Sequence, residues 1–357
     1  MRLTTARELL FDSCLLQPAW ENLATNAQRM AESYKKGETQ MFGFQKQGWF
    51  EKQLDANIEK LLDGDYSRIP WVFCSLTENH QPSKLRAASA LNEILQRLQF
   101  DAILKVDTQI RQTTSMEWSM DWRRMEMERL FTKGMSQELR RAVIIFSSFH
   151  PNGYLREKAV RMMGEYPSTL PFIILRQNDW VLQVRQAAEL AFDLRMKHLE
   201  PQEFLDALPF AEKLKGRKHG DSAQVFFNYL TSPENREDLL NGLKSPLIRT
   251  RRLCIRALLD SPNVDKALAL EQLGREPDPF LRRMIFERLS SLGEAMNEHA
   301  HIFLRDKYPA NRVLALRYLY TENPNESVGL DIAMNKLLDK NAAVRGLARE
   351  IVAEHNP

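Results

Sequence analysis

The chain has 357 residues, a net charge of +3 from 50 basic and 47 acidic side chains, and 43% hydrophobic residues. These proportions are ordinary for a soluble folded protein, and the near balance of charge demands neither nucleic acid nor a membrane surface as partner. No apolar run approaches the length needed to cross a bilayer, so we expect no membrane partner.

The cysteines and the first residues bear on the compartment. Cys14, Cys74 and Cys254 are isolated, without C-x-x-C spacing or an even number that would suggest disulfides. They are typical of small buried side chains in a reducing cytosol. Because Glu8 and Asp12 interrupt the apolar core that a signal peptide needs, we expect a cytoplasmic protein.

The first part of the chain predicts a helical cap. We expect residues 1–78 to form an N-terminal helical capping region, continuous with a solenoid of helical repeats over residues 79–357. Within the cap, residues 35–48 combine three glycines with aromatic side chains. This loop either covers the open apolar end of the solenoid or is exposed for a partner, and the need to cover that end favours the first interpretation.

The next stretch has a regular and an irregular part. Apolar residues recur at helical spacing over residues 83–100, which predicts a helix. Residues 116–127 mix methionines and tryptophans with charged residues. Such side chains can form an adaptable binding surface, but they also suit an inner helix that is buried on several sides, and we favour burial.

A strongly patterned helix is predicted to begin at Asp179, whose carboxylate is a good N-cap. Val184, Ala188 and Ala191 recur at helical spacing, and Leu190 widens this stripe so that most of two faces are apolar. Because such a helix cannot stand on a surface, we expect it to lie between neighbouring helices.

An apolar residue followed by arginine recurs along the chain. The arginines are 29 to 33 residues apart or twice that interval, and Asn311-Arg312 is a looser match. The other pairs are Leu155-Arg156, Val184-Arg185, Ile248-Arg249, Leu281-Arg282 and Val344-Arg345. A period of this length, with two helices in each unit, indicates an α-solenoid.

Four of these arginines follow an acid by six residues. The pairs are Asp179/Arg185, Glu276/Arg282, Asp306/Arg312 and Asp339/Arg345. In this the chain resembles the HEAT-repeat family, whose second helices carry an acid, then Val-Arg, then a small residue. The resemblance implies an all-α superhelix of antiparallel helix pairs, with acid and arginine bonded between successive units as a ladder. It is specific for fold and almost uninformative about function.

The ladder carries an expectation about stability. Arg345 lies in the last unit, so replacing it with Ala should loosen the array from that end. The expected loss is roughly 1–3 kcal/mol if a partner acid is left buried and unpaired.

No motif for catalysis emerges. The chain has no phosphate loop, dinucleotide fingerprint, H-E-x-x-H or nucleophile elbow. We therefore predict no catalytic, cofactor-binding or metal-ligating residue. One enzymatic alternative comes from the resemblance, because some HEAT-like proteins are DNA glycosylases that hold alkylated duplex with tryptophans and an aspartate. Trp118, Asp121 and Trp122 could supply these, although the charge balance is poorly suited to duplex DNA.

Two basic features are candidate contacts for a partner. Residues 212–220 are interpreted as a solvated basic turn. Arg249, Arg252 and Arg256 share one helix face with few acids nearby, and they either pair with acids of adjacent units or offer forked donors to carboxylates or phosphates. The leading hypothesis is a non-enzymatic scaffold whose concave face binds an acidic or extended segment of a protein through these arginines. A DNA-binding or glycosylase-like repair protein of the same fold is the alternative, and a structural subunit whose partner is fixed within a larger assembly is a third possibility.

Overall fold

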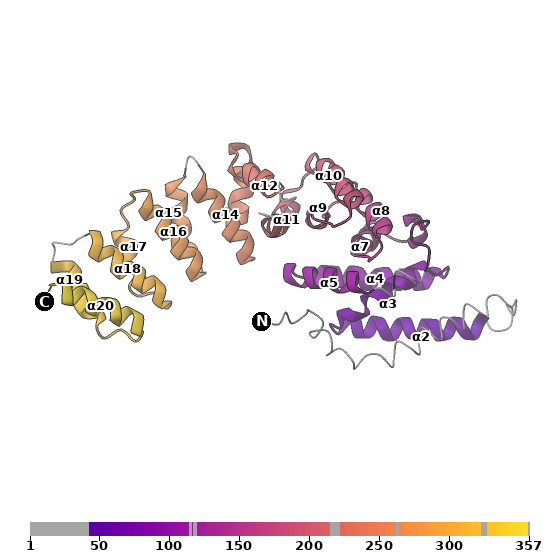
Figure 1. Cartoon of the computed structure of the whole chain (residues 1–357), viewed down its shortest axis with the longest axis horizontal. Coiled ribbons are helices and arrows are strands. Elements are labelled where there is room, and N and C mark those ends of the chain that lie inside the picture. Colours follow the sequence, from indigo (N-terminus) through magenta and orange to yellow (C-terminus); the bar gives the residue numbers. More distant parts are fainter. Residues whose placement is uncertain are drawn as a thin grey trace, which may run out of the picture.

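The computed structural model describes residues 43–113, 116, 120–214, 222–261, 264–322 and 327–355. All regular secondary structure in these ranges is helical, which confirms the predicted all-α fold. The helices stack one after another into an elongated arch, as expected for a helical-repeat protein (Figure 1). No helix in the described ranges is both long and apolar enough to cross a membrane.

An N-terminal block of helices lies beneath one half of the arch (Figure 1). It contains α2 (Gly43–Leu62), α3 (Ile69–Cys74), α4 (Gln81–Arg97) and α5 (Phe100–Gln112). Helix α4 packs against α2 and α3 as well as against α7 (Gln137–Ser147). The packing is therefore continuous across residue 78, and the division of the chain there stays a prediction.

The glycine-containing loop predicted over residues 35–48 is not a loop from Gly43 onward. Because α2 begins at Gly43, the last part of that stretch is helical. Residues 1–42, and with them Cys14 and the rest of the loop, lie outside the described ranges.

The remaining helices form antiparallel pairs that are stacked along the arch. The first three pairs are α7 with α8 (Gly153–Met163), α9 (Leu170–Gln177) with α10 (Leu182–Met196), and α11 (Pro201–Leu214) with α12 (Ser222–Thr231). The last four are α13 (Arg236–Leu243) with α14 (Ile248–Asp260), α15 (Lys266–Arg275) with α16 (Pro279–Ser291), α17 (Asn297–Phe303) with α18 (Pro309–Glu322), and α19 (Ser327–Lys336) with α20 (Ala342–His355). Each pair buries its apolar side against the next pair.

Helix α10 shows how small residues permit this stacking. Val184, Ala188 and Ala191 are buried where α10 meets α8 and α9, as the periodicity predicts. The expectation that Leu190 widens the buried stripe is wrong, because this side chain is 63% exposed. Helix α10 lies on the outer side of the arch and so keeps one face toward solvent (Figure 1).

The described methionine and tryptophan side chains of residues 116–127 are mostly buried, as we favoured, but residues 120–126 are not part of the expected inner helix. Trp122, Met125 and Met127 lie in the core; residues 120–126 form no helix, and a short 3₁₀ turn follows at Met127–Leu130. The Trp122 Nε1 donates to the Met116 carbonyl at 2.6 Å. These buried side chains therefore fill space between the N-terminal block and the solenoid instead of forming a binding surface.

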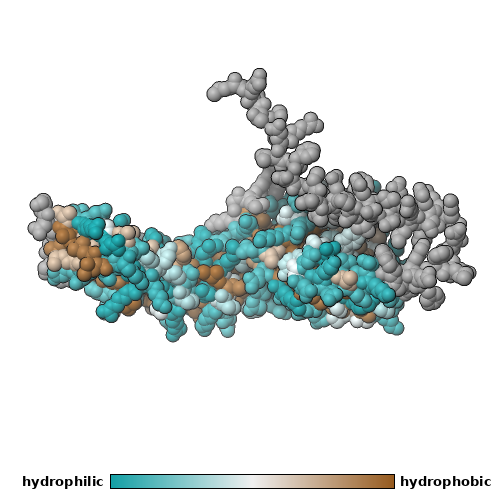
Figure 2. Space-filling model, turned by 90° about the horizontal axis from the view of Figure 1, so that it is seen from below, coloured by the Kyte–Doolittle hydropathy of each residue, from teal (hydrophilic) through white to brown (hydrophobic). Residues whose placement is uncertain are grey.

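The inner side of the arch is built from different helices in its two halves. Helices α14, α16, α18 and α20 follow it toward the C-terminus, while the N-terminal block lies beneath α7, α9 and α11 (Figure 1). Seen from below, the described surface is mostly hydrophilic, with small hydrophobic patches near the middle and at the C-terminal end (Figure 2). A partner on this side would therefore meet mainly polar groups.

Candidate functional site

A repeated contact between arginine and acid joins successive helix pairs, and we call it the ladder. Each of four arginines near the start of a second helix donates to the carboxylate of the following unit at 2.7–3.2 Å. The pairs are Arg156 with Asp179, Arg251 with Glu276, Arg282 with Asp306, and Arg312 with Asp339. The bonding between units that the HEAT resemblance implied is confirmed in these four places.

Each ladder arginine also holds the loop before its own helix. The Arg312 Nη1, for example, donates to the carbonyls of Asp306 and Lys307 at 2.8 and 3.2 Å. The Asp306 carboxylate in turn accepts from the Tyr308 N–H at 2.8 Å and shapes the same loop. The spacing of six residues in the sequence therefore reflects a hydrogen bond from the arginine to the backbone carbonyl of the acid in the same unit. The carboxylate of that acid accepts instead from the arginine of the preceding unit.

The same geometry corrects the role of Asp179. Its carboxylate accepts from the Val181 N–H at 3.0 Å, and α10 begins only at Leu182, so Asp179 is not the N-cap. It shapes the turn before the helix and receives Arg156.

The ladder also corrects two arginine assignments. In α14 the ladder residue is Arg251, whose Nη1 binds the Ser245 and Pro246 carbonyls, and not Arg249. Arg345 binds the Asp339 carbonyl at 2.7 Å and pairs with no carboxylate among the described residues. The condition attached to the Arg345→Ala expectation, a buried acid left unpaired, is therefore not met.

We expect Arg312→Ala to lower the free energy of unfolding by about 2 kcal/mol, since it leaves the nearly buried Asp339 carboxylate without its ion pair. Arg345→Ala should cost about 1 kcal/mol or less, because only hydrogen bonding to a carbonyl is lost. Hydrogen exchange in α18–α20 measures both. An equal increase in exchange for the two variants would contradict the ladder.

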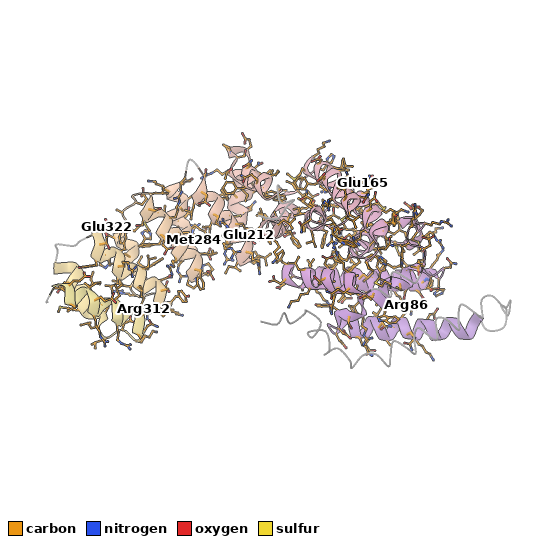
Figure 3. All side chains as sticks on the ribbon, viewed as in Figure 1. Arg86, Glu165, Glu212, Met284, Arg312 and Glu322 are labelled. Carbon is orange, nitrogen blue, oxygen red and sulfur yellow. The ribbon has the colours of Figure 1, made fainter. Side chains whose placement is uncertain are left out.

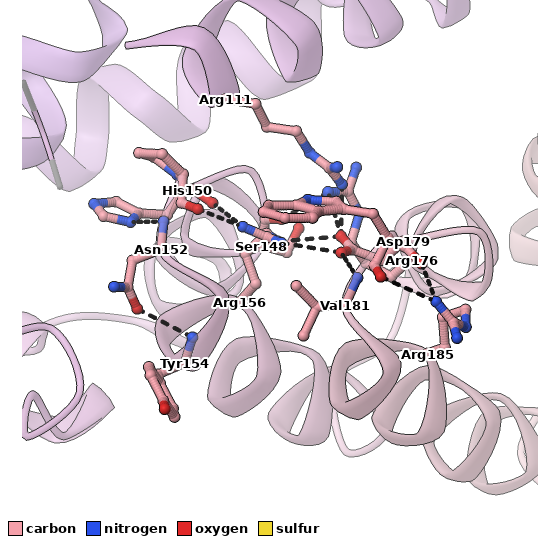
Figure 4. Close-up of polar contacts among 12 residues, drawn as sticks. Arg111, Ser148, His150, Asn152, Tyr154, Arg156, Arg176, Asp179, Val181 and Arg185 are labelled. Atoms are coloured by element: carbon pink, nitrogen blue, oxygen red, sulfur yellow. Dashed lines mark hydrogen bonds and ion pairs between the residues drawn. The ribbon is translucent and has the colours of Figure 1, made fainter. Parts of the chain in front are cut away.

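The ladder is most elaborate where the N-terminal block meets the solenoid. Here the buried Asp107, Arg156, Arg176 and Asp179, together with the partly exposed Arg111, form what we call the buried cluster. Figure 4 labels its three arginines and Asp179. The Asp179 carboxylate lies 2.7 Å from the Arg111 Nη2, 2.9 Å from the Arg156 Nη2 and 3.6 Å from the Arg176 Nη1. The Arg176 Nη2 also lies 2.6 Å from Asp107, so the cluster clamps α5 to α8, α9 and the turn before α10.

Burial and charge act against each other in the buried cluster. Burial alone would raise the pKa of Asp179, but hydrogen bonding from Arg156 and the charges of Arg111, Arg156 and Arg176 hold that pKa below its usual value. Burial lowers the pKa of Arg176 to about 10, which still leaves it charged at neutral pH. Because every member has a partner of opposite charge, the cluster is best explained as a structural clamp.

His150 lies beside the buried cluster and is fully buried. Its Nδ1 accepts from the Asn152 N–H at 3.0 Å, and its ring lies 4.2 Å from that of Trp122, centroid to centroid. Burial, together with the charge of Arg156, lowers the pKa of His150 to about 3. The imidazole is therefore neutral and part of the core at neutral pH.

The predicted partner-binding arginines lie where α14 meets α5 and α11. Arg249 pairs with Asp101 of α5 at 2.9 Å and stacks over the Phe100 ring. Arg252 and Arg256 pair with Glu212 of α11 at 2.9 and 3.4 Å (Glu212 is labelled in Figure 3). We call Arg249, Arg252 and Arg256 the arginine stripe. Their side chains stay 40–43% exposed, so internal pairing and access to a ligand coexist.

The alternative glycosylase site does not assemble in the described residues. Trp122 is 1% exposed in the core, whereas Asp121 is exposed and lies 3.5 Å from Arg124. Trp118 lies outside the described ranges. Nor do the described residues contain a group of three His, Cys, Asp or Glu side chains suited to a metal ion.

The described residues of the basic turn and the described thiols, Cys74 and Cys254, add no reactive group. Residues 212–214 belong to α11 and not to a turn, and the rest of the predicted turn lies outside the described ranges. Burial raises the pKa of Cys254 to about 12, and burial with the charge of Glu78 does the same for Cys74. Neither thiol is poised as a nucleophile.

No protein-family model matches this chain, and no curated protein matches its sequence. The structure defines its class as an all-α helical-repeat protein whose units are joined by an arginine–acid ladder.

Proposed function

We propose that this chain is a cytoplasmic, non-enzymatic scaffold of HEAT type whose inner face binds an acidic segment of a protein partner. The observation that carries the proposal is the arginine stripe. The arginines of the ladder and of the buried cluster are paired with carboxylates between helix pairs. At this junction, by contrast, three half-exposed arginines share two acids, Asp101 and Glu212.

The stripe retains donors for a ligand after its internal pairing. Arg249 and Arg252 each reach their acid through Nη2, and Arg256 reaches Glu212 through Nη1. A guanidinium has five N–H donors, so each side chain can donate to a second carboxylate without losing the first. Asp101 and Glu212 lie beside the same arginines and would repel a densely charged polyanion such as duplex DNA. The stripe therefore favours a ligand with a few separated negative charges.

The test uses Arg252→Gln/Arg256→Gln, because glutamate at these positions would face Glu212. Binding of the partner should weaken about tenfold at low salt, chiefly through slower association, and the effect should shrink as salt is added. The matched control is Arg275→Gln/Arg283→Gln, which removes two arginines that pair with acids on their own helices.

Equal binding of the stripe variant and the parent at low salt would contradict the proposal. Loss of duplex DNA binding without loss of protein binding would favour the DNA-binding alternative instead.

A further inference from the structure

A cleft of about 720 Å³ lies between α5, α9 and α11, beside the arginine stripe. Its polar lining includes Lys105, Asp107 and Arg111 from α5, Asn178 after α9, and Lys213 from α11. Lys213 directly follows Glu212, the residue that holds Arg252 and Arg256. The cleft and the stripe therefore adjoin along the last turn of α11.

The cleft has more cationic than anionic groups. Lys105 and Lys213 are exposed, and neither forms an ion pair with a described residue. Arg111 binds Asp107 through Nε and Asp179 through Nη2, which leaves its Nη1 without a hydrogen bond to the described residues. Asp107 is the one acid in the described lining, and Arg111 and Arg176 already neutralise it.

The buried cluster behind the cleft adds to the positive electrostatic potential of its lining. It contains three arginines and two aspartates, so it carries an excess positive charge in an interior of low dielectric constant. A cleft whose lining has an excess of one sign of charge, backed by such an interior, concentrates ions of the opposite sign. The partly exposed Leu104 and Leu175 also line it, which gives a bound segment apolar contacts beside the charged ones.

We propose that this cleft binds acidic side chains of an extended peptide segment, with Lys105 and Lys213 as cationic contacts beside Arg111, an arginine of the buried cluster that also lines the cleft. The segment carries Asp or Glu next to an apolar residue, since the lining offers ammonium groups and leucines together. This inference rests on the proposed function and extends it, because it places the partner's segment across α5 and α11 as well as α14.

The experiment measures binding of a fluorescent peptide of alternating Glu and Leu, with the Gln/Leu peptide as the uncharged comparison. Lys105→Glu/Lys213→Glu should weaken binding of the Glu/Leu peptide at least tenfold at low salt. Both side chains are exposed, so circular dichroism should be unchanged. Lys197→Glu/Lys340→Glu alters two other exposed lysines, gives the same net charge and should bind like the parent.

The outcomes separate this inference from the proposed function. If the stripe variant Arg252→Gln/Arg256→Gln loses binding and the cleft variant does not, the inference is wrong and the proposed function stands. If both variants bind the peptide and the protein partner like the parent, both proposals are wrong. Equal loss in the control variant, no binding by the parent, or tighter binding of single-stranded DNA than of the peptide would each overturn the cleft assignment.

Discussion

Asp179→Ala is expected to lower the free energy of unfolding by about 3–5 kcal/mol. The substitution removes the carboxylate that Arg111, Arg156 and Arg176 share, and two of these arginines are fully buried. Three like charges would then face one another with only Asp107 to offset them. Hydrogen exchange in α8–α10 and urea unfolding measure the loss, and the exchange should rise first at the turn before α10.

The matched control is Asp339→Ala at the far end of the ladder. Its carboxylate is nearly buried but receives a single arginine, Arg312, so we expect a loss of about 2 kcal/mol. Asp179→Asn should fall between the two, because its amide oxygen can still accept from the Val181 N–H. Equal losses for Asp179→Ala and Asp339→Ala would show that the buried cluster contributes no more to the free energy of unfolding than a single arginine–acid pair of the ladder.

The second large effect is acid destabilisation by His150. Its pKa is about 3 in the folded protein and about 6.5 when exposed. The stabilisation from keeping this imidazole neutral is present above pH 6.5 and is lost as the pH falls from 6.5 toward 3. Between pH 7 and pH 4.5 the unfolded chain binds the extra proton, and we expect about 2.5 kcal/mol of stability to disappear.

His150→Asn isolates this contribution, since an asparagine oxygen can replace the acceptor for the Asn152 N–H but cannot titrate. The variant should be less stable at pH 7, yet lose less stability on acidification than the parent. His301→Asn, which alters an exposed side chain of α17, should leave the pH dependence as in the parent. An unchanged pH dependence in His150→Asn would show that His150 does not titrate as proposed.

The repeat could be predicted because stacking imposes its own period on the sequence. An arginine that must reach the loop before its helix has to stand five or six residues after that loop's carbonyls, and this local spacing survives in the sequence. The pattern still assigned the wrong ladder arginine in α14. Ile248-Arg249 matches the pattern of an apolar residue followed by arginine, but Arg251 has the right distance to the loop. Because Arg251 follows Thr250, a search for an apolar residue followed by arginine selects Arg249 and passes over the arginine that forms the contact.

The partners of the candidate site could not be predicted, because they come from distant parts of the chain. Asp101 lies 148 residues from Arg249, and Glu212 lies 40 residues from Arg252. A count of acids near the stripe in the sequence therefore made it look more isolated than it is. Lys105 and Lys213 share a cleft only because α5 folds back against α9 and α11, and no motif marks either residue.

Photo-cross-linking in the native cell tests the central claim most directly. A photoreactive residue in place of Thr108, which lines the cleft, should capture a protein with an acidic segment, and nuclease treatment should not remove the product. The same residue in place of Glu189, exposed on the outer helix α10, should capture little of that protein. Capture of nucleic acid from position 108, or equal capture of the protein from both positions, would contradict an inner face that binds an acidic protein segment.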